Sequence, residues 1–176
     1  MIKIAKIIAW MEDFVEVKNK DFGGLPPCPY AKEARLKNKI NFVEFSNDRP
    51  DSEIEQYIHN MDFDKHDVTV IIFEKDRWTA KEAFKIAREL EDIAEEKGIL
   101  LGEDHPHMPE TVGTSLLNNG DFIIFFLQKK EQVEAYGEKL RKTAYYDVWK
   151  KDNPYDIDNP DNYNARHEQY KLKFGE

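Results

Sequence analysis

Two short segments of the sequence carry the residue types from which active sites are commonly built. The first contains His105, His107 and Glu110. In an extended chain, two histidines separated by one residue point to the same side, and a nearby carboxylate completes a two-histidine, one-carboxylate set that leaves metal positions open to substrate. We therefore expect His105, His107 and Glu110 to bind a divalent transition metal, with iron preferred and zinc as the alternative. Solvated histidines that bind nothing are the competing interpretation.

The second segment surrounds Cys28, the single cysteine of the chain. Prolines restrict the backbone on both sides of it, and a helix is predicted to begin at Ala31. The positive field at the start of a helix stabilises a thiolate, which is a nucleophile or a redox centre. Cys28 and Tyr30 are therefore candidate catalytic residues, and Cys28 is a further metal ligand if the two loops meet. A buried, unreactive cysteine is the alternative.

The stretch from Cys28 to Tyr30 is similar to the glutaredoxin active site, which has the form Cys-Pro-Tyr-Cys. The second cysteine of that motif is Ala31 here, so a two-thiol exchange cycle is excluded. A loop with glycine and proline also precedes the motif, where glutaredoxins have a strand. The resemblance therefore implies at most a redox protein that works with a single thiol.

A longer resemblance covers the stretch Gly24-Leu-Pro-Pro-Cys-Pro-Tyr-Ala-Lys32, the predicted strand that follows it, and the pair His105-Pro106. These features resemble a family of uncharacterised bacterial proteins that is known only as a domain of unknown function. The likeness ends after His107. It implies no activity, and it adds only that Cys28 and His105 lie in one site.

Length, charge and cysteine content narrow the class of protein. A chain of 176 residues can bury one core but is too short for two ordinary domains. Its formal net charge of −9 argues against general nucleic-acid binding and against an anionic membrane surface. We find neither a signal peptide nor an apolar run long enough to cross a membrane. One cysteine excludes an internal disulfide, so we expect a cytoplasmic protein.

The spacing of apolar residues predicts the order of the secondary structure. Residues 68–73 and 122–127 are apolar on both faces, which is typical of strands in a sheet that is covered on both sides. A capping box at Thr79 and Glu82 begins the clearest helix. The other predicted elements are helices over 2–18, 31–37, 50–61, 109–117 and 133–149 and strands over 40–45 and 99–101.

This order predicts an α+β fold, with helices packed on a mixed four-stranded sheet that is ferredoxin-like or thioredoxin-like, and with an extra N-terminal helix. We expect one domain over 1–150 and an irregular tail over 151–176 that packs on the domain or forms a homodimer. The leading hypothesis is a metal-dependent enzyme acting on a small-molecule substrate, such as a non-haem iron oxidoreductase. A non-catalytic interaction or assembly module and a single-cysteine thiol-redox protein are the alternatives.

Overall fold

The computed structural model describes residues 2–46, 49, 52–108 and 110–148. The expected tail over 151–176 lies outside the described residues, and so does the homodimer contact attributed to it. Among the helices that are described, every one is too short or too polar to span a bilayer.

A mixed four-stranded sheet forms the centre of the molecule, with strand order β1-β2-β6-β3. β1 runs parallel to β2, whereas β6 is antiparallel to both of its neighbours, β2 and β3. The α+β fold, the mixed sheet and the N-terminal helix are thereby confirmed. The strands are β1 (Ile40–Glu44), β2 (Val68–Glu74), β3 (Ile99–Asp104) and β6 (Phe122–Lys129).

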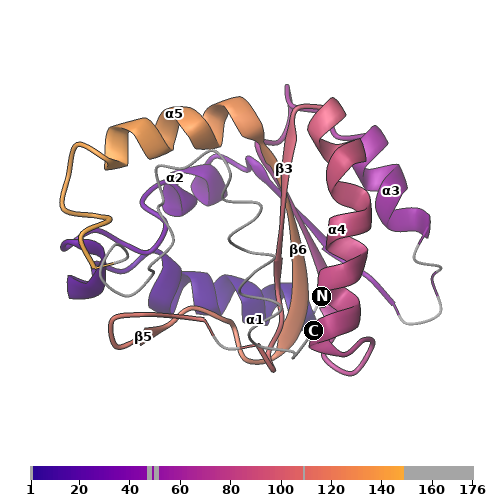
Figure 1. Cartoon of the computed structure of the whole chain (residues 1–176), viewed down its shortest axis with the longest axis horizontal. Coiled ribbons are helices and arrows are strands. Elements are labelled where there is room, and N and C mark those ends of the chain that lie inside the picture. The colour runs from indigo at the N-terminus through magenta and orange to yellow at the C-terminus, as the bar shows by residue number, and fades with distance from the viewer. Residues whose placement is uncertain (1, 47–48, 50–51, 109, 149–176) are drawn as a thin grey trace.

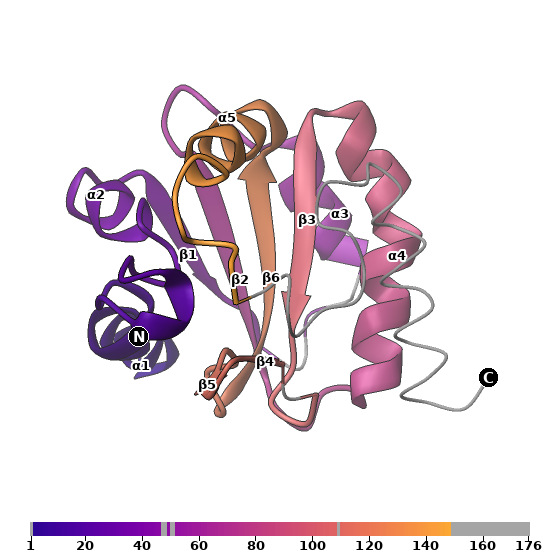
Figure 2. The ribbon, with the colours of Figure 1, turned by 60° about the vertical axis from the view of Figure 1, so that its left-hand side comes forward.

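Helices cover both faces of this sheet (Figures 1 and 2). The two central strands are apolar at every second position on each face, because successive side chains of a strand point in opposite directions. On β2, Ile71 and Phe73 belong to one core, while Val70 and Ile72 belong to another. The covered sheet that the two apolar runs predicted is therefore present.

The crossover helices α3 (Ser52–His59) and α4 (Ala80–Glu96) cover one face. The capping box at the start of α4 is confirmed, since the Thr79 side chain accepts from the backbone of Glu82 and the Glu82 side chain accepts from the backbone of Thr79. Three alanines of α4 let the helix approach the sheet closely. The resulting core contains fully buried rings, among them Phe73 and Phe125.

The opposite face is covered by segments from the two ends of the described chain (Figure 2). α1 continues directly into a π-helical turn in which the Glu16 amide donates to the Met11 carbonyl at 2.8 Å. A 3₁₀ turn, a second short helix and the last helix complete this layer. These elements are α1 (Ile2–Trp10), the π turn Met11–Val15, the 3₁₀ turn Lys20–Phe22, α2 (Ala31–Leu36) and α5 (Lys130–Leu140).

Two predicted helices, over 109–117 and 133–149, differ most from the observed structure. In place of a helix over 109–117, the chain forms the small hairpin of β4 (Thr111–Val112) and β5 (Ser115–Leu116). The buried Asp21 carboxylate explains this, because it accepts bonds from the Thr114 amide and hydroxyl, each at 2.9 Å, and from the Ser115 hydroxyl at 2.8 Å. α5 ends at Leu140 rather than near 149, where Thr143 bonds to the Leu140 carbonyl through its hydroxyl and its amide.

Candidate functional site

His105, the central residue of the predicted metal site, is buried and has a partner at each ring nitrogen. Its side chain is 1% exposed, its Nε2 lies 3.0 Å from the Trp78 carbonyl oxygen, and its Nδ1 accepts from the His107 amide at 3.0 Å. These partners define a neutral ring with the hydrogen on Nε2. Burial lowers the pKa of His105, which also favours the neutral form. The lone pair that a metal requires is therefore engaged in a structural hydrogen bond.

The described residues do not assemble the predicted ligand set of His105, His107 and Glu110. No group of three or more His, Cys, Asp or Glu side chains within the described ranges is placed to hold a metal ion. The backbone gives the reason, since the Met108 amide bonds to the His105 carbonyl at 2.9 Å and closes a turn. The prediction relied on an extended chain, in which alternate side chains share a side, and the turn removes that relation.

The two predicted segments lie on opposite faces of the sheet. Along β3, Leu101 packs in the core beneath α4, and Glu103 bonds to Arg88 of α4 at 2.8 Å. His105 comes two residues after Glu103, so its side chain lies on the same side of the sheet. It bonds to the carbonyl of Trp78, whose ring packs in that core. Cys28 instead packs against the core beneath α1 and α2. The sheet therefore separates Cys28 from His105.

Hydrogen bonds at both ends fix the loop that carries Cys28. The Cys28 amide donates to the Val15 carbonyl at 3.1 Å, and its own carbonyl accepts from the Ala31 amide at 3.2 Å. The Tyr145 hydroxyl also donates to the Pro27 carbonyl. Burial raises the pKa of the Cys28 thiol, and this effect exceeds the opposing effect of nearby backbone donors. A thiol with a raised pKa is a poor nucleophile at neutral pH, so the structure favours Cys28 as a neutral, unreactive thiol.

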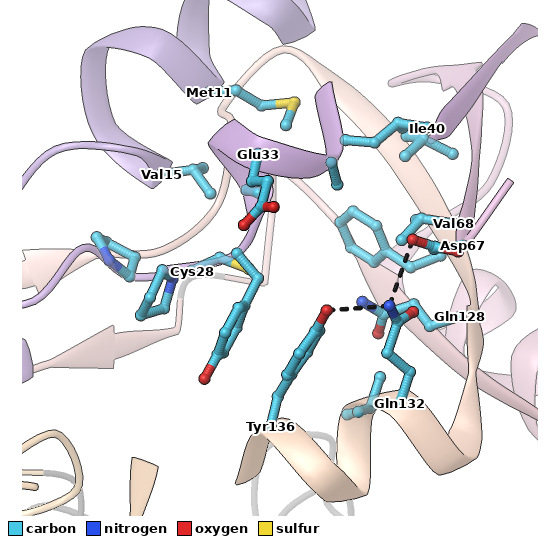
Figure 3. A pocket seen from close by; sticks show the side chains of 18 of the residues that line it. Met11, Val15, Cys28, Glu33, Ile40, Asp67, Val68, Gln128, Gln132 and Tyr136 are labelled. Carbon is cyan, nitrogen blue, oxygen red and sulfur yellow. Dashed lines mark hydrogen bonds between the residues drawn. The ribbon is translucent and has the colours of Figure 1, made fainter. Parts of the chain in front are cut away.

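A cavity of about 730 Å³ opens beside Cys28, between the sheet and the helices of this face (Figure 3). Its floor is formed by β1, β2 and β6, and its sides by the π turn, the Cys28 loop, α2 and α5. Most of the lining is apolar or aromatic. The apolar and aromatic part includes Ile7, Trp10, Met11, Phe14, Val15, Ile40, Val68, Val70, Phe126 and Val133.

Two side-chain contacts hold the walls of this cavity in place. The guanidinium of Arg35 on α2 forms a two-pronged ion pair with Glu16, with N–O distances of 2.7 and 2.9 Å. This pair joins α2 to the end of the π turn, and the Glu16 side chain is only 4% exposed. Tyr30, at the start of α2, stacks on Tyr136 of α5 with ring centroids 3.6 Å apart. Desolvation raises the pKa of Tyr30, the charge interaction with the neighbouring Tyr136 raises it further, and Tyr30 is therefore a neutral phenol.

One end of the cavity is polar (Figure 3). There the Gln132 Nε2 donates to the Asp67 carboxylate at 3.3 Å and to the Tyr136 hydroxyl at 3.0 Å. Gln128 of β6 lies beside them in the lining. Asp67 and Gln128 come together because β2 and β6 pair with Val68 opposite Gln128.

Sequence reasoning missed this polar end. Tyr136 lies within the predicted helix over 133–149, and Gln132 lies one residue before that helix. Their spacing of four residues places both side chains on one helical face, which was the signal available. Asp67 and Gln128 lie at the ends of two apolar strands, but only the pairing of those strands shows that they are neighbours.

Comparison of the chain with protein-family models, with curated proteins and with solved structures finds no match in any of the three. The resemblance of the Cys28 segment to a family of uncharacterised bacterial proteins therefore stays a prediction.

Proposed function

We propose that the protein binds a small organic molecule in the cavity beside Cys28. The cavity carries this proposal. Its volume of about 730 Å³ is in the range of small-molecule sites, and its lining has the usual composition, apolar over most of its area with a small number of polar groups.

Packing supports a ligand rather than an accidental void. Protein interiors are close-packed, whereas this cavity is half open and leaves apolar side chains in contact with water, which a bound molecule would displace. On the opposite face of the same sheet, α3 and α4 pack directly on fully buried side chains of the strands. The cavity is kept open by the Arg35–Glu16 ion pair and the Tyr30–Tyr136 stack, which span its walls. A bound molecule would supply the missing contacts.

The protonation states favour binding over covalent chemistry. Cys28 and Tyr30 both have a raised pKa, so both line the cavity as neutral groups at ordinary pH. A non-haem iron oxidoreductase with His105, His107 and Glu110 as ligands has no support in this geometry, because the described residues do not form that set. A single-thiol redox protein would need a Cys28 pKa that is lowered, the opposite of the direction found.

Blocking the cavity from α2 tests the proposal. Ala34 lines the cavity, so Ala34→Phe places a ring inside it. The matched control is Ala135→Phe, on the exposed side of α5. We expect the parent protein to bind the fluorescent probe 8-anilinonaphthalene-1-sulfonate saturably, and Ala34→Phe to weaken this binding by at least about ten-fold while Ala135→Phe does not. No saturable binding by the parent, or equal binding by all three folded proteins, would overturn the proposal.

A further inference from the structure

The polar end of the cavity has hydrogen-bonding groups that the protein itself leaves available. This inference rests on the proposed binding function and names the class of ligand. The side-chain amide of Gln128, which lines the cavity, forms no hydrogen bond with any other described residue. It is half-buried on β6, on the same face as Phe126. A partly buried amide without a partner stabilises whatever molecule satisfies both its donor and its acceptor.

Asp67 adds a carboxylate that has no cation beside it. Its one side-chain hydrogen bond within the described part of the chain comes from the Gln132 Nε2 at 3.3 Å, and it takes part in no ion pair there. The lysines of the lining are engaged elsewhere, since Lys37 pairs with Glu33 and the Lys39 Nζ donates to the Asp64 carbonyl at 2.9 Å. The polar end therefore presents one uncompensated negative charge to the cavity.

Among the groups that remain, acceptor lone pairs outnumber donor hydrogens, because each carbonyl or carboxylate oxygen has two lone pairs. Gln132 uses both hydrogens of its Nε2, on Asp67 and on Tyr136, and keeps its carbonyl oxygen free within the described residues. Gln128 offers a second carbonyl oxygen, and Asp67 offers a carboxylate oxygen. The available donors are the Gln128 amide hydrogens and the hydroxyl hydrogen of Tyr136. A ligand that matches this end must be rich in donors, must hold at least one acceptor, and gains from a positive charge.

The walls next to this end are aromatic. Tyr136 carries one of the polar groups itself, and its ring stacks on Tyr30. Trp10, Phe14 and Phe126 line the remainder of the cavity. Aromatic walls favour flat rings, because offset-stacked and edge-to-face contacts add to the burial of apolar area. A flexible aliphatic amine would satisfy Asp67 but would gain none of these contacts.

The geometry points to a planar nitrogen heterocycle with an amino group next to a ring nitrogen, bound with that edge against Asp67 and Gln128. In a ring of the 2-aminoimidazole type, the ring N–H and the amino group supply two donors side by side, which suits a carboxylate, and the other ring nitrogen accepts from the Gln128 amide. The ring lies among the aromatic walls. Cys28, with its raised pKa, forms part of the opposite wall and takes no chemical part.

Three bicyclic probes of nearly equal size test this assignment, namely indane, benzimidazole and 2-aminobenzimidazole. Each is measured by displacement of 8-anilinonaphthalene-1-sulfonate from the full chain. We expect 2-aminobenzimidazole to bind about ten-fold more tightly than benzimidazole, with indane the weakest. Asp67→Asn and Gln128→Leu should each weaken 2-aminobenzimidazole by about ten-fold and leave indane unchanged. Unchanged indane binding also shows that the variants are folded.

The matched controls carry the same chemical changes on the other side of the molecule. They are Asp92→Asn on α4 and Gln56→Leu on α3, both exposed, and both should bind all three probes as the parent does. Equal binding of indane and 2-aminobenzimidazole, or insensitivity of 2-aminobenzimidazole to Asp67→Asn and Gln128→Leu, would overturn the ligand class and leave the binding cavity standing. Failure of the fluorescent probe to bind at all would overturn the proposed function itself.

Discussion

The two faces of the sheet are covered in different ways, and the difference separates stability from function. On one face, α3 and α4 are crossovers between neighbouring parts of the sheet, and their apolar stripes pack directly on the strands. On the other face, segments before β1 and after β6 form the cover and are joined to each other by an ion pair, a tyrosine stack and loop hydrogen bonds. Elements joined in this way leave a cavity between them.

The largest expected effect comes from a substitution in the core beneath α3 and α4, on the face that we call the packed face. The face that bears the cavity is called the cavity face. Phe73 is fully buried, and its ring lies 5.0 Å from Phe45, 4.8 Å from Trp78 and 5.2 Å from Phe125 between centroids. Phe73→Ala should lower the free energy of unfolding by about 3–5 kcal/mol. The matched variant Phe126→Ala removes a half-buried ring that already faces the cavity, and should cost clearly less.

Urea unfolding of the parent and both variants measures this difference. Equal losses for Phe73→Ala and Phe126→Ala would mean that the cavity face is as tightly packed in solution as the other, and the contrast between the faces would disappear.

A smaller effect comes from two adjacent residues at the end of β3 that respond to pH in opposite directions. Burial raises the pKa of Asp104 to about 6 from its ordinary 3.8, so folding favours its protonated form. The contribution of Asp104 to the free energy of unfolding is at most about 3 kcal/mol. It is fully present below about pH 4 and is lost as the pH rises through about 6. Burial lowers the pKa of His105, so its contribution is present above its ordinary 6.5 and is lost as the pH falls.

Replacing one residue of this pair makes the pH response of the other residue measurable. Asp104→Asn keeps an oxygen for Asn119, which donates to the Asp104 carboxylate at 2.7 Å, but cannot ionise. We expect this variant to gain stability relative to the parent as the pH rises from about 4 to about 6, which leaves the opposite slope of His105 visible. Denaturant midpoints across that range measure the two slopes. A constant difference between variant and parent would show that Asp104 titrates normally in the folded protein.

The elements on both faces were largely predictable from local patterns, and the long-range contacts on the cavity face were not. The capping box at Thr79 and the doubly apolar runs of β2 and β6 encode their structure within a few residues. The β4–β5 hairpin depends on Asp21, more than ninety residues away, and no local pattern shows that contact. The predicted metal motif failed to assemble for a related reason, since the turn after His105 replaced the extended backbone that the motif needs.

Part of the cavity could be anticipated and part could not. Cys28 and Tyr30 line the cavity, because prolines and backbone bonds fix their loop against the π turn. Asp67 and Gln128 lie about sixty residues apart in sequence. They meet only through the antiparallel pairing of β2 with β6, which periodicity alone does not reveal.

The smallest expected effect concerns a glycine in the cover of the cavity. Gly137 lies within α5, where glycine is less favourable than alanine by up to about 1 kcal/mol. A methyl group there would lie 3.9 Å from the Tyr146 hydroxyl and 4.0 Å from the Arg141 Nη1, which are ordinary contacts. Gly137→Ala should therefore raise the unfolding free energy by several tenths of a kcal/mol to about 1 kcal/mol. Thermal unfolding followed by circular dichroism measures the change.

Gly113 provides the contrasting control for that glycine. It has a φ of +59°, and a methyl group would lie 2.7 Å from the Asp21 carboxylate, so Gly113→Ala should destabilise the protein. A gain from Gly137→Ala with undiminished binding of the fluorescent probe would show that the cover of the cavity can be strengthened without filling the cavity. The stability of the helices on this face would then be independent of binding in the cavity that they enclose. A loss of stability in Gly137→Ala would instead mean that α5 packs so closely on its neighbours that the added methyl group clashes with them.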